Sequence, residues 1–141
     1  MSSSRLAQFS GQKYLSLETF RKNGIGVRTP VWFAASADPA QDPHAVFYVY
    51  TLADSGKIKR IRNNPRVRIA PCSASGRVRS EWIDAEAKLA TSLESENGQH
   101  LLKKKYFPLK AIGDWFSRLR GRTQTLVAIR PNVQPLKDNS G

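Results

Sequence analysis

Short β-prone runs separated by turn signals dominate this chain, and they constrain its fold more than any other feature. Runs that alternate polar and apolar residues, or are continuously apolar, are typical of strands, and they cover residues 14–21, 26–35, 45–51, 66–70, 81–89 and 123–130. Helical spacing is confined to residues 55–63, 91–106 and 108–121. Because strands dominate and no β-α-β alternation runs through the chain, the order favours an antiparallel β-barrel with helices packed at its side.

Local signals mark several of the expected boundaries. Asn23-Gly24 is a strong hairpin-turn signal between the first two strands. Pro30 lacks a backbone N–H, so it predicts an edge position or a bulge within the second strand. Asn64-Pro65 ends the first helix, and Thr91 with Glu94 forms a capping box that opens the second.

The length of 141 residues is that of one domain. We expect this domain to span residues 14–131, with loose segments at residues 1–13 and 132–141. The longest apolar run covers only residues 45–50, far short of the roughly 20 that a membrane-spanning helix needs. The single cysteine and the lack of an apolar leader predict a cytoplasmic protein.

The net charge is the anomaly in the composition. Lysine and arginine number 23 against 11 aspartate and glutamate, a formal net charge of +12. Such a surplus predicts an anionic partner, which could be nucleic acid, a membrane surface or a phosphorylated small molecule. A solvated surface is the simplest interpretation of each basic cluster. Arg77 and Arg79 follow a strand connection and could reach an anionic ligand, whereas the clusters at 103–105 and 118–122 could serve solubility, nucleic acid or the polyanionic tail of a ligand.

The segment from residue 50 to residue 67 has the features of a phosphate site. A strand is followed by a short loop and a helix start that carries Ser55, Gly56 and Lys57. Free amides and the dipole at a helix start favour an anion, glycine permits close approach, and lysine adds charge. Thr51 supplies a second hydroxyl. The alternative is a solvated basic helix whose two isoleucines face the core.

These residues resemble the cofactor loop of the pyridoxamine 5'-phosphate oxidase-like split-barrel proteins, which bind FMN or the deazaflavin coenzyme F420. The matching residues are Tyr50, Thr51, Ser55, Lys57 and Asn64-Pro65-Arg66-Val67. Thr29-Pro30-Val31-Trp32-Phe33 is similar to the strand with which the family's reductase branch contacts its cofactor. The resemblance covers residues 14–131, and residues 54–72 and 118–131 look closest to the probable deazaflavin-dependent branch.

The resemblance implies a mainly β fold, a six-stranded antiparallel split barrel, and a homodimer with the cofactor at its interface. The cofactor would be FMN or F420, and the implied activity is hydride transfer to or from a small-molecule substrate. The residues expected at the cofactor are Thr29, Pro30, Val31, Trp32, Tyr50, Thr51, Ser55, Gly56, Lys57 and Arg79. Ser55, the Gly56 amide and Lys57 would hold the phosphate, and Thr51 and Arg79 would add polar contacts.

Several residues depart from the family pattern, and these departures bear on the substrate. Thr29 and Ala34 stand where the oxidase has an arginine and a lysine, Gly56 replaces a basic residue, and Arg79 replaces a glutamine. The C-terminal substrate motif of the vitamin B6 enzyme is absent. These differences argue against pyridoxamine phosphate as the substrate.

The remaining reactive and aromatic residues give weaker indications of function. Cys72 has no histidine tied to it by sequence and is expected to pack in the core, and His44 and His100 are expected at the surface. One cysteine and two histidines do not make a structural zinc site. Trp82 falls on the polar face of its strand, which is compatible with a dimer contact, ring stacking or partial burial.

Two function classes therefore stand side by side. The first is a flavin- or deazaflavin-dependent oxidoreductase, in which the cofactor carries the hydride and no catalytic histidine or carboxylate pair is needed. The second is a basic nucleic-acid-binding module without redox activity, supported by the net charge but by no recognisable nucleic-acid-binding motif. The phosphate-site segment favours the first.

Overall fold

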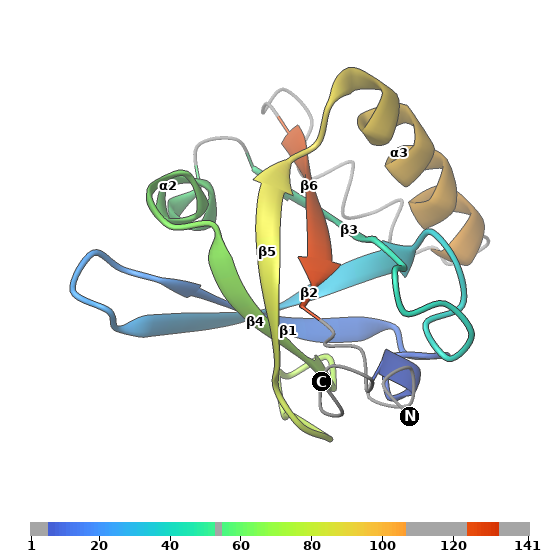
Figure 1. The fold of residues 1–141 in the computed structure, drawn as a ribbon, viewed down its shortest axis with the longest axis horizontal. Coiled ribbons are helices and arrows are strands. Elements are labelled where there is room, and N and C mark those ends of the chain that lie inside the picture. The colour runs from blue at the N-terminus through green and yellow to red at the C-terminus, as the bar shows by residue number, and fades with distance from the viewer. Residues whose placement is uncertain (1–5, 53–54, 107–123, 133–141) are drawn as a thin grey trace, which may run out of the picture.

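In a computed structural model, which describes residues 6–52, 55–106 and 124–132, the chain forms a closed antiparallel barrel of six strands with helices at its side (Figure 1). The elements are β1 (Tyr14–Phe20), β2 (Gly26–Ala35), β3 (Phe47–Leu52), α2 (Gly56–Asn63), β4 (Arg66–Cys72), β5 (Ile83–Leu89), α3 (Ser92–Tyr106) and β6 (Gln124–Pro131). Around the barrel the order is β1-β2-β3-β6-β5-β4. The expected mainly β antiparallel barrel is confirmed.

Strands β1 and β2 form the hairpin that the Asn-Gly dipeptide predicts. They pair from Tyr14 with Trp32 to Phe20 with Gly26, and Gly24 lies in the left-handed region with a φ of 88°. The hairpin end projects beyond the body of the barrel, on the side where α2 lies (Figure 1). A residue with a side chain would be strained at Gly24, which explains why glycine stands at this turn.

The barrel is split between β2 and β3. These two strands pair only over Phe33–Ala35 and Phe47–Val49. Beyond that point the earlier half of β2 pairs with β1 alone, and Tyr50 to Leu52 of β3 pair with β6 alone. Pro30 lies in the half of β2 that pairs with β1 but not with β3, an edge position of the kind that its missing N–H predicts. The divergence leaves space at this side of the barrel.

The barrel core extends to the N-terminal segment. Phe9, Phe33 and Phe47 pack together with ring centroids 5.1 to 6.2 Å apart, and Leu6 is fully buried. The expectation of a loose segment over residues 1–13 is therefore wrong for its described part. The burial of Leu6 and Phe9 in the core offsets part of the entropy cost of ordering this segment.

The two described helices are held by caps and by small-residue contacts. Ser55 caps α2, and α3 begins with the expected capping box, in which Thr91 N–H donates to Glu94 Oε1 (3.0 Å) and Glu94 N–H to Thr91 Oγ1 (3.2 Å). Gly98 of α3 is buried against Tyr48 and Leu126 of the barrel, where a Cβ atom would overlap Leu126. The helix expected at 108–121 lies outside the described residues. In the described part of the chain, no helix has the length and apolarity to cross a membrane.

Candidate functional site

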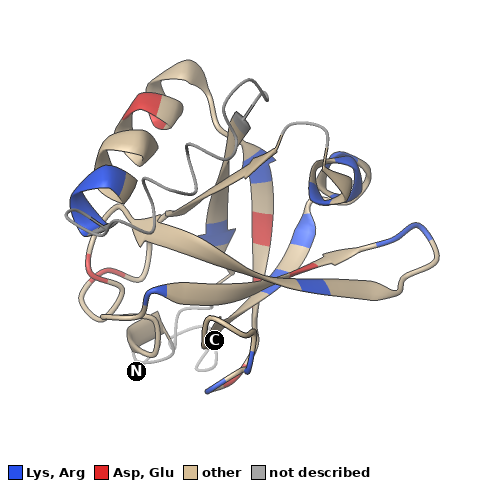
Figure 2. Ribbon diagram, turned by 180° about the vertical axis from the view of Figure 1, so that it is seen from behind, with Lys and Arg blue, Asp and Glu red and all other residues tan. Residues whose placement is uncertain are grey.

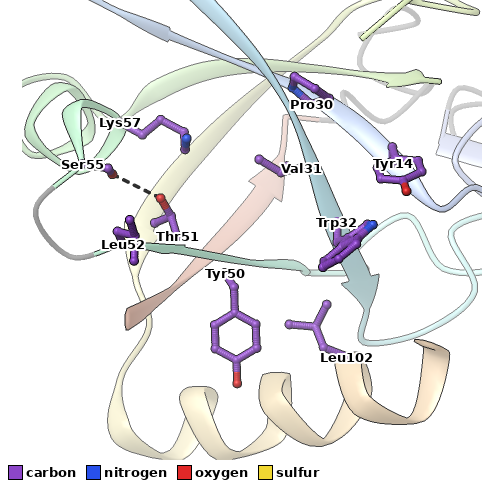
Figure 3. Close-up of a pocket in the computed structure, with 10 residues that line it drawn as sticks. All are labelled: Tyr14, Pro30, Val31, Trp32, Tyr50, Thr51, Leu52, Ser55, Lys57 and Leu102. Atoms are coloured by element: carbon purple, nitrogen blue, oxygen red, sulfur yellow. Dashed lines mark hydrogen bonds between the residues drawn. The ribbon is translucent and has the colours of Figure 1, made fainter. Parts of the chain in front are cut away.

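A pocket of about 300 Å³ opens where β2 and β3 diverge (Figure 3). The residues that line it come from both strands, from the start of β1, from the start of α2 and from α3. They are Tyr14, Pro30, Val31, Trp32, Tyr50, Thr51, Leu52, Ser55, Lys57 and Leu102. The pocket is therefore a product of the split in the barrel, with α2 at one end and α3 at the other.

Two hydroxyls and an amine gather at the α2 end of the pocket. Ser55 Oγ lies 3.1 Å from Thr51 Oγ1 and accepts a longer bond from the Ile58 amide (3.4 Å), as an N-cap residue does. Lys57, in the first turn of α2, points from the helix toward the pocket (Figure 3). The first two amides of any α-helix have no acceptor within the helix, so this end of the pocket is rich in donors.

Lys57 is a partly buried cation for which the described residues supply no counter-ion. Among the described residues, no carboxylate and no hydrogen-bond acceptor pairs with its amine. Burial lowers the pKa of Lys57, and the nearby guanidinium of Arg60 lowers it further. Both causes disfavour the charged form of the amine, and a nearby anion would counteract them. The arrangement therefore favours an anionic ligand group at this point.

The rest of the pocket wall is aromatic and aliphatic. The rings of Tyr14 and Trp32, which are directly paired across β1 and β2, lie with centroids 6.3 Å apart. Tyr50 points toward α3, which contributes Leu102 from the opposite side (Figure 3). Burial raises the pKa of the Tyr50 hydroxyl to about 12, so this tyrosine is neutral at physiological pH. A flat apolar ring would fit against such walls.

Seven of the ten predicted site residues are brought together in this pocket. They are Pro30, Val31, Trp32, Tyr50, Thr51, Ser55 and Lys57. Thr29 does not line it, although its Oγ1 is buried and finds no hydrogen-bond partner among the described residues. Gly56 is exposed at the helix start, and its bare Cα permits the approach of the Arg60 guanidinium, which a Cβ would meet at 2.8 Å.

Arg79 was expected to contact the cofactor, but it does not line the pocket. Its side chain is exposed and donates to Gln12 Oε1 at 3.5 Å, and it is not among the pocket residues. Its guanidinium lies near Cys72 instead, where burial raises the pKa of the thiol and Arg79 lowers it in part. Cys72 is buried, as expected. Trp82 is half-buried, with the guanidinium carbons of Arg28 and Arg68 at 4.7 and 5.1 Å from its ring centroid.

Sequence reasoning missed four residues of this region. Tyr14, Leu52 and Leu102 line the pocket, and Arg60 lies beside Lys57. Leu52 directly follows the predicted strand and could have been found by extending the motif by one residue. Tyr14 could have been found from hairpin register, because the turn places it opposite Trp32. Nothing in the spacing of α3 indicates that Leu102 would reach β3.

The donor set fits a phosphate-bearing aromatic cofactor. The end of the pocket that carries the Lys57 amine and the Thr51 and Ser55 hydroxyls suits a phosphate. The apolar walls suit a ring system. Among the described residues, no cluster of histidine, cysteine or carboxylate side chains could hold a metal ion.

Comparison with known proteins supports the fold. No family model matches the sequence, and no curated protein matches it. Among solved structures, a candidate pyridoxamine 5'-phosphate oxidase from Listeria innocua superposes with a TM-score of 0.60 at 15% identity, covering 93% of both chains. An FAD-binding protein from Mesorhizobium loti gives 0.59 at 17% identity, covering 94% of this chain and 88% of that one. HutZ, a heme storage protein of Vibrio cholerae, gives 0.60 at 17% identity, covering 93% and 88%.

The chain thus has the split β-barrel fold of the pyridoxamine 5'-phosphate oxidase-like proteins. The resemblance seen in the sequence is confirmed at the level of the fold. The neighbours differ in what their names say they bind, a flavin in one case and heme in another. The ligand of this chain has to be argued from its own pocket.

Proposed function

We propose that the pocket between β2 and β3 holds a flavin-type cofactor, FMN or the deazaflavin F420, and that the protein is an oxidoreductase acting on a small molecule. The observation that carries the proposal is the partly buried amine of Lys57, which has no counter-ion among the described residues and lies with two hydroxyls at one end of a pocket whose other walls are apolar. Burying a cation is costly unless an anion accompanies it. A phosphate attached to a planar ring satisfies both ends of the pocket at once.

Residues at the two ends of the pocket would have different roles. Lys57, Ser55 and Thr51 would bind the phosphate, and Val31, Trp32 and Tyr14 would orient the ring and exclude water from one of its faces. When bound, a flavin or deazaflavin supplies the hydride-transfer chemistry. The neutral Tyr50 hydroxyl would provide a donor that does not change its charge over the physiological pH range.

We further propose that a second copy of the chain completes the site. A volume of about 300 Å³ lies at the lower end of the range of roughly 300–1,000 Å³ typical of ligand pockets. Pro30 is exposed and Trp32 is only half-buried, so this wall of the pocket is open. A partner subunit laid over it would cover the second face of the ring.

The substrate is expected to differ from pyridoxamine phosphate. Thr29 and Ala34 stand where the oxidase has basic residues, and Ala34 is buried against α3 rather than turned to the pocket. With a single, buried thiol the chain is compatible with a reducing compartment, and we place the reaction in the cytoplasm.

Lys57→Ala tests the proposal. Removing a charge-assisted hydrogen bond to phosphate costs about 1.5–3 kcal/mol, which is a loss of FMN affinity on the order of ten- to a hundredfold. Lys59→Ala is the matched control, because Lys59 has the same charge but is exposed and does not line the pocket. Its replacement should change FMN affinity by less than about threefold.

Titration of both variants with FMN, riboflavin and F420 gives the readout. Riboflavin has the ring without the phosphate, so Lys57→Ala should leave riboflavin affinity nearly unchanged. Equal loss of FMN affinity in the two variants, or equal loss of FMN and riboflavin affinity in Lys57→Ala, would show that the phosphate does not lie at Lys57.

A further inference from the structure

The end of the β1–β2 hairpin and the outer side of α2 carry a set of exposed cations that the cofactor site does not use. These are Arg21 and Lys22 on the hairpin end and Lys59 and Arg62 on α2, here called the basic surface. All four side chains are exposed, and in the described part of the chain none takes part in an ion pair. Elsewhere Arg28, Arg68, Lys88 and Arg130 are each paired with a glutamate.

The two segments of the basic surface lie next to each other. Arg60 of α2 donates from Nε to Thr19 Oγ1 of β1 at 2.6 Å, which ties the helix to the hairpin. Burial lowers the pKa of the Arg60 guanidinium, and the charge of Arg21 lowers it further. Arg60 is therefore close enough to Arg21 for their repulsion to matter. In Figure 2 the cations of the hairpin end and of α2 gather at the same end of the molecule.

The basic surface and the pocket lie on different sides of α2. Ile58 and Ile61 are buried in the core, and Lys57 lines the pocket. Lys59 and Arg62 are three residues apart and therefore share the remaining, solvent-facing side of the helix. The helix thus presents one cation to the cofactor pocket and two away from it.

In the described part of the chain, no acidic side chain forms an ion pair with these four cations. Residues 19–37 and 55–80 contain no aspartate or glutamate, and the acidic residues nearest in sequence to the two segments are Glu18 and Asp54. Glu18 is already bonded to Arg28 and Arg68. Like charges held together repel one another, and a bound polyanion would relieve this repulsion.

We propose that the basic surface binds the phosphate backbone of a nucleic acid. Arginine supplies two of the four cations and matches phosphate geometry, and the exposed amides of Asn23 and Asn63 lie beside them as further donors. A second copy of the chain would bring like charges together and does not fit. A membrane-inserting surface would need more apolar anchors, and Ile25 is the single exposed large hydrophobic residue among the described residues of this end.

The expected binding is salt-dependent and tolerant of sequence. About four phosphate contacts give a slope of log affinity against log salt of about −3.6 on duplex DNA and about −2.8 on a single strand. Fluorescence anisotropy of labelled 20-nucleotide RNA and DNA, single-stranded and duplex, between about 50 and 200 mM salt measures this slope. The basic-surface variants are Lys59→Gln/Arg62→Gln and Arg21→Gln/Lys22→Gln.

Lys103→Gln/Lys104→Gln is the matched control. This variant also removes two positive charges, but from exposed positions on α3, away from the basic surface (Figure 2). Each basic-surface variant should reduce the steepness of the slope by about 1.8 on duplex DNA and about 1.4 on a single strand, and weaken binding at low salt by about tenfold or more, whereas the control should change neither. FMN affinity should be unchanged in all three, so failure here is distinguishable from failure of the cofactor proposal.

Three outcomes would overturn the proposal. The first is no binding of any of the nucleic acids at about 100 µM protein and low salt, where even non-specific binding is measurable. The second is equal loss in the basic-surface and control variants, which would mean that only net charge matters. The third is binding to vesicles of mixed phosphatidylserine and phosphatidylcholine without binding to nucleic acid, which would assign the surface to a membrane.

Discussion

Glu18 holds together three strands of the barrel through one carboxylate, and replacing it with glutamine is the most informative perturbation of the fold. Its side chain is only 6% exposed. Oε2 accepts from Nε of Arg28 on β2 at 3.0 Å, and Oε1 accepts from Nε of Arg68 on β4 at 2.6 Å. Both guanidinium groups also lie over the Trp82 ring. Glutamine keeps the shape of the side chain, but it removes the charge and turns one oxygen into a donor.

The cost of Glu18→Gln follows from these contacts. The new amide NH₂ faces a guanidinium N–H, so one hydrogen bond to a charged acceptor is lost, worth about 1.5–3 kcal/mol. The arginine side chains are 55% and 36% exposed, which places the loss in the lower part of that range. We expect about 2 kcal/mol. For a domain of this size, that corresponds to a fall in Tm of about 7 °C.

The pH dependence gives a sharper readout. Burial alone would raise the pKa of Glu18, but the hydrogen bonds from Arg68 and Arg28 outweigh it and leave the pKa below its usual value. A lowered pKa in the folded state stabilises the protein above the pKa of the unfolded chain, and this stabilisation is lost as the pH falls through the folded value. The Tm difference between the native protein and Glu18→Gln should therefore shrink between pH 7 and pH 3.

Thermal unfolding followed by circular dichroism measures both effects, with Glu86→Gln as the control. Among the described residues, Glu86 pairs with Lys88 alone, at 3.9 Å and with both side chains exposed, so its loss should cost less than about 0.5 kcal/mol. If the two variants lower Tm equally, or if the Glu18→Gln difference grows on acidification, the carboxylate does not stabilise the barrel in the way argued.

Two further predictions follow from the packing of α3 and the open wall of the pocket. Gly98→Ala should lower the free energy of unfolding by about 1 kcal/mol, because overpacking against Leu126 and Tyr48 outweighs the gain in helix propensity. Asn97→Ala, at an exposed position of the same helix, is the control and should not lower it. Equal urea denaturation midpoints for the two variants would contradict this prediction. Light scattering at micromolar concentration should report about twice the chain mass of 15.8 kDa, and a monomer that still binds FMN would exclude a shared site.

Much of the fold could be predicted because local signals coincide with the strand ends. β2 spans residues 26–35 as expected, since Asn23-Gly24 fixes the turn before it. The misses lie where tertiary contacts override local signals. β4 continues through Pro71 to Cys72, because β1 pairs with it there. β5 begins at Ile83 rather than at residue 81, because its pairing with β4 begins with Ile69 opposite Ile83.

The pocket could be predicted only in the part that is contiguous in sequence. Thr51, Ser55 and Lys57 belong to one strand-loop-helix unit, so their proximity follows from local geometry. Their meeting with Trp32 depends on the split between β2 and β3, and no local signal specifies where two strands diverge.

The placement of Leu102 depends on a contact of still longer range. α3 reaches the barrel because Gly98 has no side chain to hold it off Tyr48 and Leu126. Within a helical pattern an isolated glycine predicts only a local loss of helix stability. Here that glycine sets the distance between the helix and the sheet, and the leucine one turn later closes the pocket. The apolar end of the candidate site is thus determined by a close approach between elements, whereas its cationic end is determined by a helix start.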